Sequence, residues 1–141
     1  MTGRSLHRDE RGINRSFLLV VILLAIVGVL IVDGGSILFA TVQLQDAADL
    51  AATDAASVYE DTHSQTQACQ AAERVIEGRD SEAEIVGGCS SKGSKFFVAT
   101  ATGAVSLIVR KEATTVVLGR IDAFKSWTSI EVTGRGTPSV L

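Results

Sequence analysis

The hydrophobic pattern of the chain begins with an uninterrupted apolar run of 16 residues, Phe17 to Val32. At a rise of about 1.5 Å per residue, a helix over this run is roughly 24 Å long, and flanking residues extend it to the thickness of a bilayer's hydrocarbon core. Helix-forming residues continue without proline to Tyr59, in an amphipathic pattern. The pattern therefore predicts one long helix, embedded in a membrane at its start and facing water or protein at its end.

The amphipathic part of this helix carries a narrow seam of small and apolar residues with 4/3 spacing. These residues are Ile37, Thr41, Leu44, Ala48, Ala51, Ala55 and Val58. Small side chains allow a neighbouring element to approach closely. The seam is expected to pack either on the chain's own folded domain or on copies and relatives in an assembly, and both alternatives stay open here.

Beyond the long helix, the pattern predicts a small domain. Residues 60–66 are polar and are expected to form a linker or bend, and residues 67–77 have the spacing of a short helix with Gly78 as its C-cap. Alternating apolar residues then predict strands at 84–86, 96–102, 105–110 and 126–133. The resulting fold class is α+β, a long N-terminal helix (transmembrane, then amphipathic) followed by a short helix and a small antiparallel β-sheet.

Three details of this domain remain less defined by the pattern. Thr102-Gly103-Ala104 suits either a hairpin turn or a bulge in one bent strand. Residues 114–124 fit both a strand and a helix, and residues 134–138 are expected to close the domain as a loop and tail.

Positive charge predicts the orientation in the membrane. Four arginines (Arg4, Arg8, Arg11 and Arg15) precede the apolar run, and the next basic residue is Arg74. Because positive charge near a span tends to stay in the cytoplasm, the N-terminus is expected inside and the rest outside. The expected parts are a cytoplasmic N-terminus at 1–16, a transmembrane segment at 17–36, an amphipathic helix and linker at 37–62 and an extracytoplasmic domain at 63–141.

A cleaved secretory signal is the competing interpretation of the basic start and apolar run. The small residues Gly34, Gly35 and Ser36 would suit a cleavage site, but helix-compatible hydrophobicity resumes at once with Ile37. Retention of the helix is therefore favoured.

Asp33 interrupts the apolar pattern and allows two interpretations. It lies either at the outer headgroup level, where a carboxylate is solvated, or within the apolar zone, where it would need a partner because an isolated carboxylate costs a few kcal/mol. Gly28, Gly34 and Gly35 would permit a neighbouring helix to come close.

Two cysteines, Cys69 and Cys89, flank the turn from the short helix to the first strand. In an oxidising compartment they are expected to form one disulfide, and closing a loop of about 20 residues contributes roughly 3 kcal/mol. No metal site is expected, because neither cysteine has a CxxC partner and His7 and His63 are distant in sequence.

Charge and motifs exclude several function classes. Residues 1–84 carry six basic and 13 acidic side chains and residues 85–141 carry seven and three, so a formal charge of -7 is followed by one of +4. The two halves could attract each other within or between molecules, but no basic cluster is dense enough to suggest nucleic-acid binding. No catalytic constellation is found, so neither an enzyme nor a cofactor is expected.

The N-terminal part resembles a known family. Arg11-Gly12, the apolar run, Val32-Asp33-x-Gly35 and the stretch LQDAADLAA from Leu44 to Ala52 are similar to TadE/TadG-like proteins of Flp (tight adherence) pilus systems. The downstream cysteines resemble the short actinobacterial TadE-like type. The resemblance implies a membrane-anchored accessory or minor pilin-like component with a structural role, whose partners are the membrane, other pilin-like or pilus-assembly proteins and copies of itself.

The chain departs from pseudopilins that a prepilin peptidase cuts. Those proteins carry a glutamate five residues beyond a glycine at the head of the apolar run, whereas here Phe17 follows Gly12 at that distance. An uncleaved accessory protein fits this departure better than a polymerising pilin. The alternative function is a monomeric anchored module that binds a ligand or senses the envelope. Candidates for helix association are Asp33, Gly34, Gly35, Gln45, Ala48, Asp49, Ala51 and Ala55.

Overall fold

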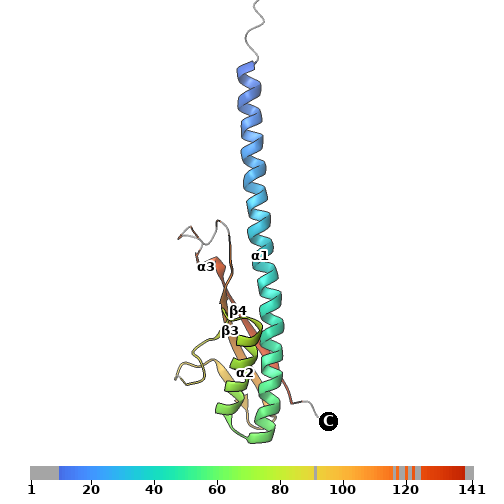
Figure 1. The fold of residues 1–141 in the computed structure, drawn as a ribbon, viewed down its shortest axis with the longest axis vertical. Coiled ribbons are helices and arrows are strands. Elements are labelled where there is room, and N and C mark those ends of the chain that lie inside the picture. The colour runs from blue at the N-terminus through green and yellow to red at the C-terminus, as the bar shows by residue number, and fades with distance from the viewer. Residues whose placement is uncertain are drawn as a thin grey trace, which may run out of the picture.

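One helix, α1 (Glu10–Thr62), dominates the fold (Figure 1). The computed structural model describes residues 10–90, 92–115, 117, 120, 122 and 125–138. Within this part, α1 is continuous over 53 residues, which confirms the prediction of a single long helix. Its N-terminal half projects beyond the rest of the molecule, while its C-terminal half packs against the other elements (Figure 1).

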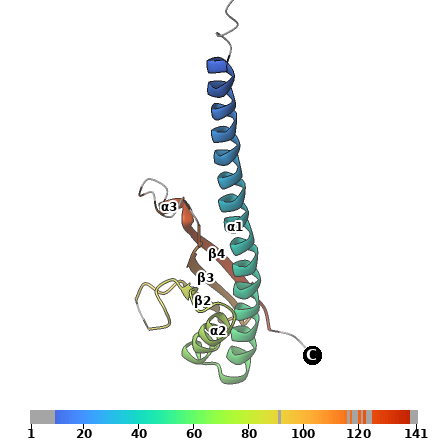
Figure 2. The ribbon, with the colours of Figure 1, turned by 45° about the horizontal axis from the view of Figure 1, so that its top comes forward.

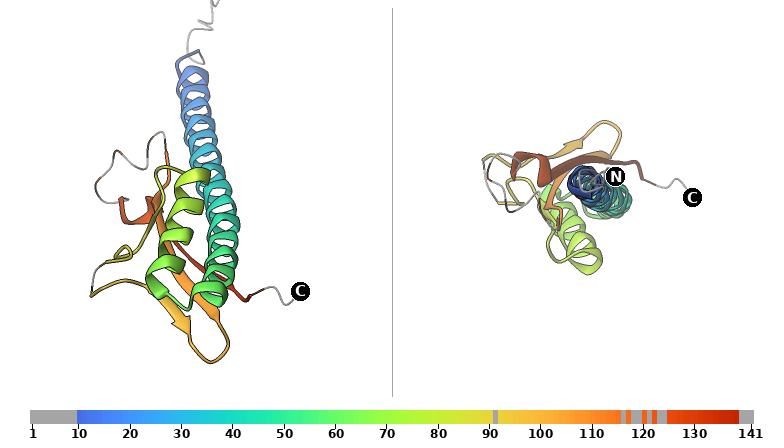
Figure 3. Two further views of the ribbon diagram at one scale, coloured as in Figure 1. Left: turned by 60° about the horizontal axis from the view of Figure 1, so that its bottom comes forward. Right: turned by 90° about the horizontal axis from the view of Figure 1, so that it is seen from above.

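The second helix, α2 (Gln65–Arg79), follows α1 almost directly and runs back beside its C-terminal half (Figure 3). His63 adopts a left-handed backbone conformation with φ of 51°, and the Ser64 hydroxyl accepts a hydrogen bond from the Gln67 N–H as the N-cap. The predicted linker or bend over 60–66 is therefore only a bend at His63 and Ser64, because residues 60–62 still belong to α1 and residues 65–66 already belong to α2. Gly78 is not the C-cap, since the helix continues past it and Asp80 caps it.

Four strands form an antiparallel sheet, as predicted. They are β1 (Glu84–Ile85), β2 (Phe96–Ala99), β3 (Ala104–Glu112) and β4 (Ser129–Gly136). The central strand β3 pairs with β4 along one edge, Val109 lying opposite Val132. Along its other edge it pairs first with β2 and then with β1, Leu107 opposite Phe96 and Val109 opposite Ile85.

The helices α1 and α2 cover one face of this sheet (Figures 2 and 3). Alternate strand residues are buried on the helix side, and those on the opposite face are more exposed. Small side chains of the helices meet larger ones of the strands in the core. Its members include Leu44, Ala48, Ala51, Ala52, Ala55, Ala68, Ala72 and Ile76 from the helices and Ile85, Phe96, Val98, Val105, Leu107, Val109, Ile130 and Val132 from the strands.

The turn between β2 and β3 is a hairpin turn and not a bulge. Gly103 donates its N–H to the Ala99 carbonyl at 2.8 Å and has a φ of 68°, a conformation that glycine adopts without strain. This resolves the alternative that the pattern had left open.

The end of the chain differs from the prediction. A short helix, α3 (Lys125–Thr128), occupies the expected start of the last strand, and β4 continues through Gly134 to Gly136, where a loop was expected. The glycines indicated a loop in sequence, but in the structure they allow β4 to pass close to α1. Most of residues 114–124, whose state was ambiguous, lie outside the described residues.

Candidate functional site: the long helix and its contacts

The apolar half of α1 has no covering element in the part of the chain that the structure describes. The large side chains from Phe17 to Val32 are exposed. By length and composition, α1 is a helix that could cross a membrane.

Asp33 lies where this apolar half meets the domain, and its carboxylate is fully buried. The N–H of Val117, from the segment between β3 and β4, donates a hydrogen bond of 3.1 Å to Asp33 Oδ2. The carboxylate is therefore not solvated at the headgroup level. One of its partners is a backbone amide of the same chain, which sequence reasoning did not find because the two residues are 84 positions apart.

The seam of small residues packs on the chain's own domain. Ala48, Ala51 and Ala55 are fully buried, as is Leu44, against the sheet and α2. Of the two alternatives, packing on the chain's own domain and packing on other copies or relatives, the structure shows the first for these residues. In the folded chain they are not accessible to another copy.

Gln45 and Asp49 fasten β4 to α1. Asp49 Oδ1 accepts a hydrogen bond of 3.0 Å from the N–H of Arg135, and Gln45 Nε2 donates to the Thr133 carbonyl at 3.0 Å. The same amide nitrogen of Gln45 also donates to Asp49 Oδ2. These side chains therefore satisfy outward-pointing backbone groups of a sheet edge, which would otherwise be open to pairing with another strand.

A different face of α1 remains uncovered beyond Asp33. Gly35, Leu38, Phe39 and Val42 follow the helical spacing of one face, and the three large side chains are 70%, 66% and 62% exposed. At Gly35 an added Cβ would meet nothing within 4 Å. We call these four residues the outward face. Sequence reasoning singled out Gly35 but missed the other three, because it followed the small-residue seam and not the apolar residues beside it.

The predicted disulfide joins Cys69 in α2 to Cys89 in the loop after β1, with Cα atoms 5.6 Å apart. Glu73 Oε1 accepts a hydrogen bond of 3.1 Å from the Cys89 N–H, so the loop is held to α2 twice. These three residues have ligand-type atoms within 4.8 Å of one another. Because the two sulfur atoms are bonded to each other, the cysteines are not thiolates that could bind a metal ion.

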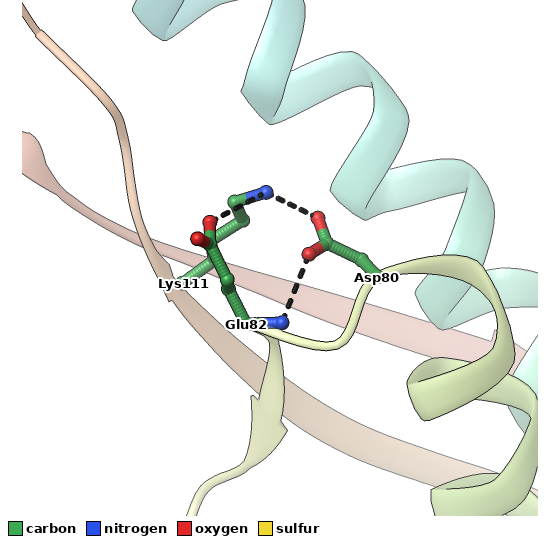
Figure 4. A network of polar contacts seen from close by, with 3 residues as sticks. All are labelled: Asp80, Glu82 and Lys111. Atoms are coloured by element: carbon green, nitrogen blue, oxygen red, sulfur yellow. Dashed lines mark hydrogen bonds and ion pairs between the residues drawn. The ribbon is translucent and has the colours of Figure 1, made fainter.

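A polar network ties the α2–β1 connection to β3 (Figure 4). Lys111 Nζ contacts Asp80 Oδ2 at 2.5 Å and Glu82 Oε2 at 3.5 Å, and the N–H of Glu82 donates to Asp80 Oδ1. The hydrogen bond to Asp80 raises the pKa of Lys111 above its usual value. Lys111 and Asp80 are mostly buried, and the arrangement positions the chain ahead of β1.

Comparison with known proteins identifies the N-terminal region. Residues 16–58 match the Tad family model, described as "Putative Flp pilus-assembly TadE/G-like". The chain is TadE/G-like over this segment. The match includes the apolar half of α1, Asp33, the outward face and the Gln45–Asp49 contacts, and it confirms the resemblance there. No curated protein and no solved structure gives a significant match. The likeness of the cysteine-containing part to the short actinobacterial type stays a prediction, because it lies beyond residue 58.

Proposed function

We propose that this TadE/G-like chain is a membrane-anchored accessory or minor pilin-like component of an Flp-type pilus or a related secretion apparatus, with a structural role. The family match supports a membrane-associated Tad pilus component and suggests a structural protein and not an enzyme. Helix α1 anchors the chain by a single pass.

One observation carries the proposal. The segment that matches the family, residues 16–58, is helical. The face of this helix that carries the small-residue seam is buried against the chain's own domain, whereas its outward face stays exposed. Apolar side chains beside an accessible glycine are a typical helix–helix contact in membranes. Of the residues that are candidates for helix association, Gly35 is exposed, whereas Ala48, Ala51 and Ala55 are buried in the core of the domain. The outward face is therefore where we place the contact with a pilin-like helix or a second copy.

We further propose that the N-terminus is cytoplasmic and that the domain lies outside. The arginines before the apolar run favour this orientation. The disulfide between Cys69 and Cys89 agrees with it, because such bonds persist in oxidising compartments.

Photo-crosslinking tests the proposal against the alternative of a monomeric envelope module. We would replace Phe39, on the outward face, by p-benzoylphenylalanine in cells that produce the pilus. Phe97 provides a matched control, because it is also a phenylalanine, is 64% exposed and lies on the far face of the sheet.

Crosslinks from position 39 to a pilus component or to a second copy, with none from position 97, are the expected result. Irradiation that yields no protein adduct at position 39 would contradict assembly through the outward face and favour the monomeric module.

A further inference from the structure

The exposed side of α1 changes from apolar to acidic beyond the outward face. Three exposed residues follow Phe39 at intervals of seven, namely Asp46, Thr53 and Glu60. Seven residues are close to two turns of an α-helix, so these side chains lie with Phe39 along one line of α1. We call Asp46, Thr53 and Glu60 the acidic line. It continues the outward face into the part of the helix that packs on the domain, and the exposure of its side chains shows that no described element covers it.

The two carboxylates of the acidic line are not paired within the chain. Asp46 and Glu60 form no ion pair with any residue that the structure describes. Arg79, in the last turn of α2, lines a hollow of about 280 Å³ together with Asp46, but no ion pair joins the two. The negative charge of this line is therefore presented to the surroundings of the molecule.

The charges of α1 argue against a second copy as the partner on this line. The chain has no lysine or arginine between Arg15 and Arg74, so α1 carries no cation beyond its apolar half. When two parallel copies of α1 meet through their outward faces, carboxylates of one helix approach only carboxylates or neutral groups of the other, whatever the register. Like charges at close range are unfavourable, whereas opposite charges favour and orient an interface. A helix with basic residues is therefore the complementary partner.

We propose that the outward face and the acidic line together bind a different membrane protein, whose apolar helix continues outside the membrane as a basic helix. Lysine or arginine residues of that helix lie opposite Asp46 and Glu60, which are 14 residues apart, and an apolar side chain between them meets Leu50, which is 43% exposed. Ion pairs on an exposed helix are individually weak and are screened by salt. They therefore select the partner, while the apolar contact holds it. The inference rests on the proposed contact through the outward face and specifies its partner.

A charge-reversed copy of the chain is a probe with this chemistry. Asp46→Lys combined with Glu60→Lys places two cations on the same line and leaves the outward face unchanged. In cells without other pilus components, we would produce the natural chain with p-benzoylphenylalanine at position 39 together with an epitope-tagged second copy. Tagged adducts are expected to be about tenfold more abundant when the second copy is charge-reversed than when it is natural.

Two further tagged copies control for the change in total charge and for folding. Glu77→Lys with Glu84→Lys makes the same change in charge at exposed positions of α2 and β1, and this copy is expected to crosslink no more than the natural one. Asp46→Asn with Glu60→Gln removes the two charges without reversing them and is expected to give an intermediate yield. Formation of the disulfide in each copy verifies that its domain is folded.

The same reversal has the opposite effect on the natural partner. In cells that produce the pilus, position 39 of the natural chain is expected to crosslink to a different protein and not to a second copy. Asp46→Lys with Glu60→Lys in the crosslinking chain is expected to lower that yield about tenfold, because attraction becomes repulsion. Glu77→Lys with Glu84→Lys is expected to leave it unchanged.

The outcomes separate this inference from the proposed function. Crosslinks from position 39 to a pilus component that charge reversal does not alter would overturn the basic partner and leave assembly through the outward face intact. Crosslinks mainly between natural copies, or equal yields with natural and charge-reversed copies, would likewise contradict the inference alone. Absence of every adduct at position 39 would overturn both, because no contact through the outward face would remain.

Discussion

Gly134 brings strand β4 into direct contact with the backbone of α1. An added Cβ at this position would lie 2.3 Å from the Ala48 carbonyl oxygen, and neither backbone can move without breaking the hydrogen bonds of Gln45 and Asp49. Gly134→Ala is therefore expected to lower the free energy of unfolding by about 2–3 kcal/mol, at the upper end of overpacking effects. Urea denaturation of the full chain in detergent, followed by circular dichroism, measures it.

Gly78→Ala is the matched control for this substitution. Gly78 lies within α2, and an added Cβ there would meet nothing within 4 Å. Because alanine favours a helix interior over glycine, this variant should gain about 0.5–1 kcal/mol. Equal stability of the Gly134→Ala variant and the natural chain would refute the close approach of β4 to α1.

Lys111 gives the stability a dependence on pH. Its pKa is raised, first by the hydrogen bond to Asp80, so the folded state favours the charged form. That contribution is fully present below the ordinary lysine pKa of 10.5 and is lost as the pH rises through the raised value. Lys111→Met should lower the free energy of unfolding by about 1–2 kcal/mol at neutral pH, because it also leaves the partly buried Asp80 without its cation.

The measurement is the difference in urea midpoint between the natural chain and the Lys111→Met variant from neutral pH to beyond 10.5. The difference in urea midpoint should stay constant up to about pH 10.5 and then shrink at higher pH, because Lys111 loses its charge there. Lys92→Met, at an exposed position, serves as the control and should change stability by less than about 0.5 kcal/mol. A difference that persists at the highest pH would argue against a charge effect.

At the scale of elements, the contact between α1 and β4 depends on two side chains of the family-matched segment. Asp49→Ala removes the acceptor of the Arg135 N–H and of the Gln45 amide. Hydrogen bonds to charged groups contribute about 1.5–3 kcal/mol, and partial exposure reduces this, so we expect a loss of about 1–2 kcal/mol. The accompanying change should be faster hydrogen exchange at the Arg135 amide.

A double-mutant cycle with Gln45→Ala tests whether the two side chains act together. Their shared hydrogen bond predicts that the double variant loses less than the sum of the single losses, by about 0.5 kcal/mol or more. Asp54→Ala, on the exposed side of α1, is the control and should be neutral. Strict additivity would mean that Gln45 and Asp49 hold β4 independently.

The positions of most helices and strands could be predicted from the sequence, because the patterns that indicate them involve residues close together in the chain. The run from Phe17 and the alternation in β3 depend on neighbouring residues, and both were found. The continuation of β4 through Gly134 was missed, because glycine signals a loop unless one knows that Ala48 lies opposite. The same limit applies to the candidate site. The sequence placed Asp33 at a boundary, but its hydrogen bond to Val117 spans 84 positions.

At the scale of the whole molecule, α1 is both anchor and core. Its apolar half stands outside the domain, and its other half supplies buried residues between Leu44 and Ala56, among them Ala48, Ala52 and Ala55, on which the sheet packs. The two halves meet at Asp33, whose partner Val117 belongs to the domain. The domain is thus fixed to the helix at the point where the helix would leave the membrane.

This arrangement predicts that the chain is not cut after Ser36. A signal peptidase needs an extended segment near its small residues, whereas Gly34, Gly35 and Ser36 lie inside α1. Cutting there would also remove Asp33 and leave Val117 without its acceptor. N-terminal sequencing of the chain recovered from membranes should therefore find no product that begins at Ile37. Recovery of the natural chain as a soluble product that begins at residue 37 would show that the apolar half is a signal and not an anchor.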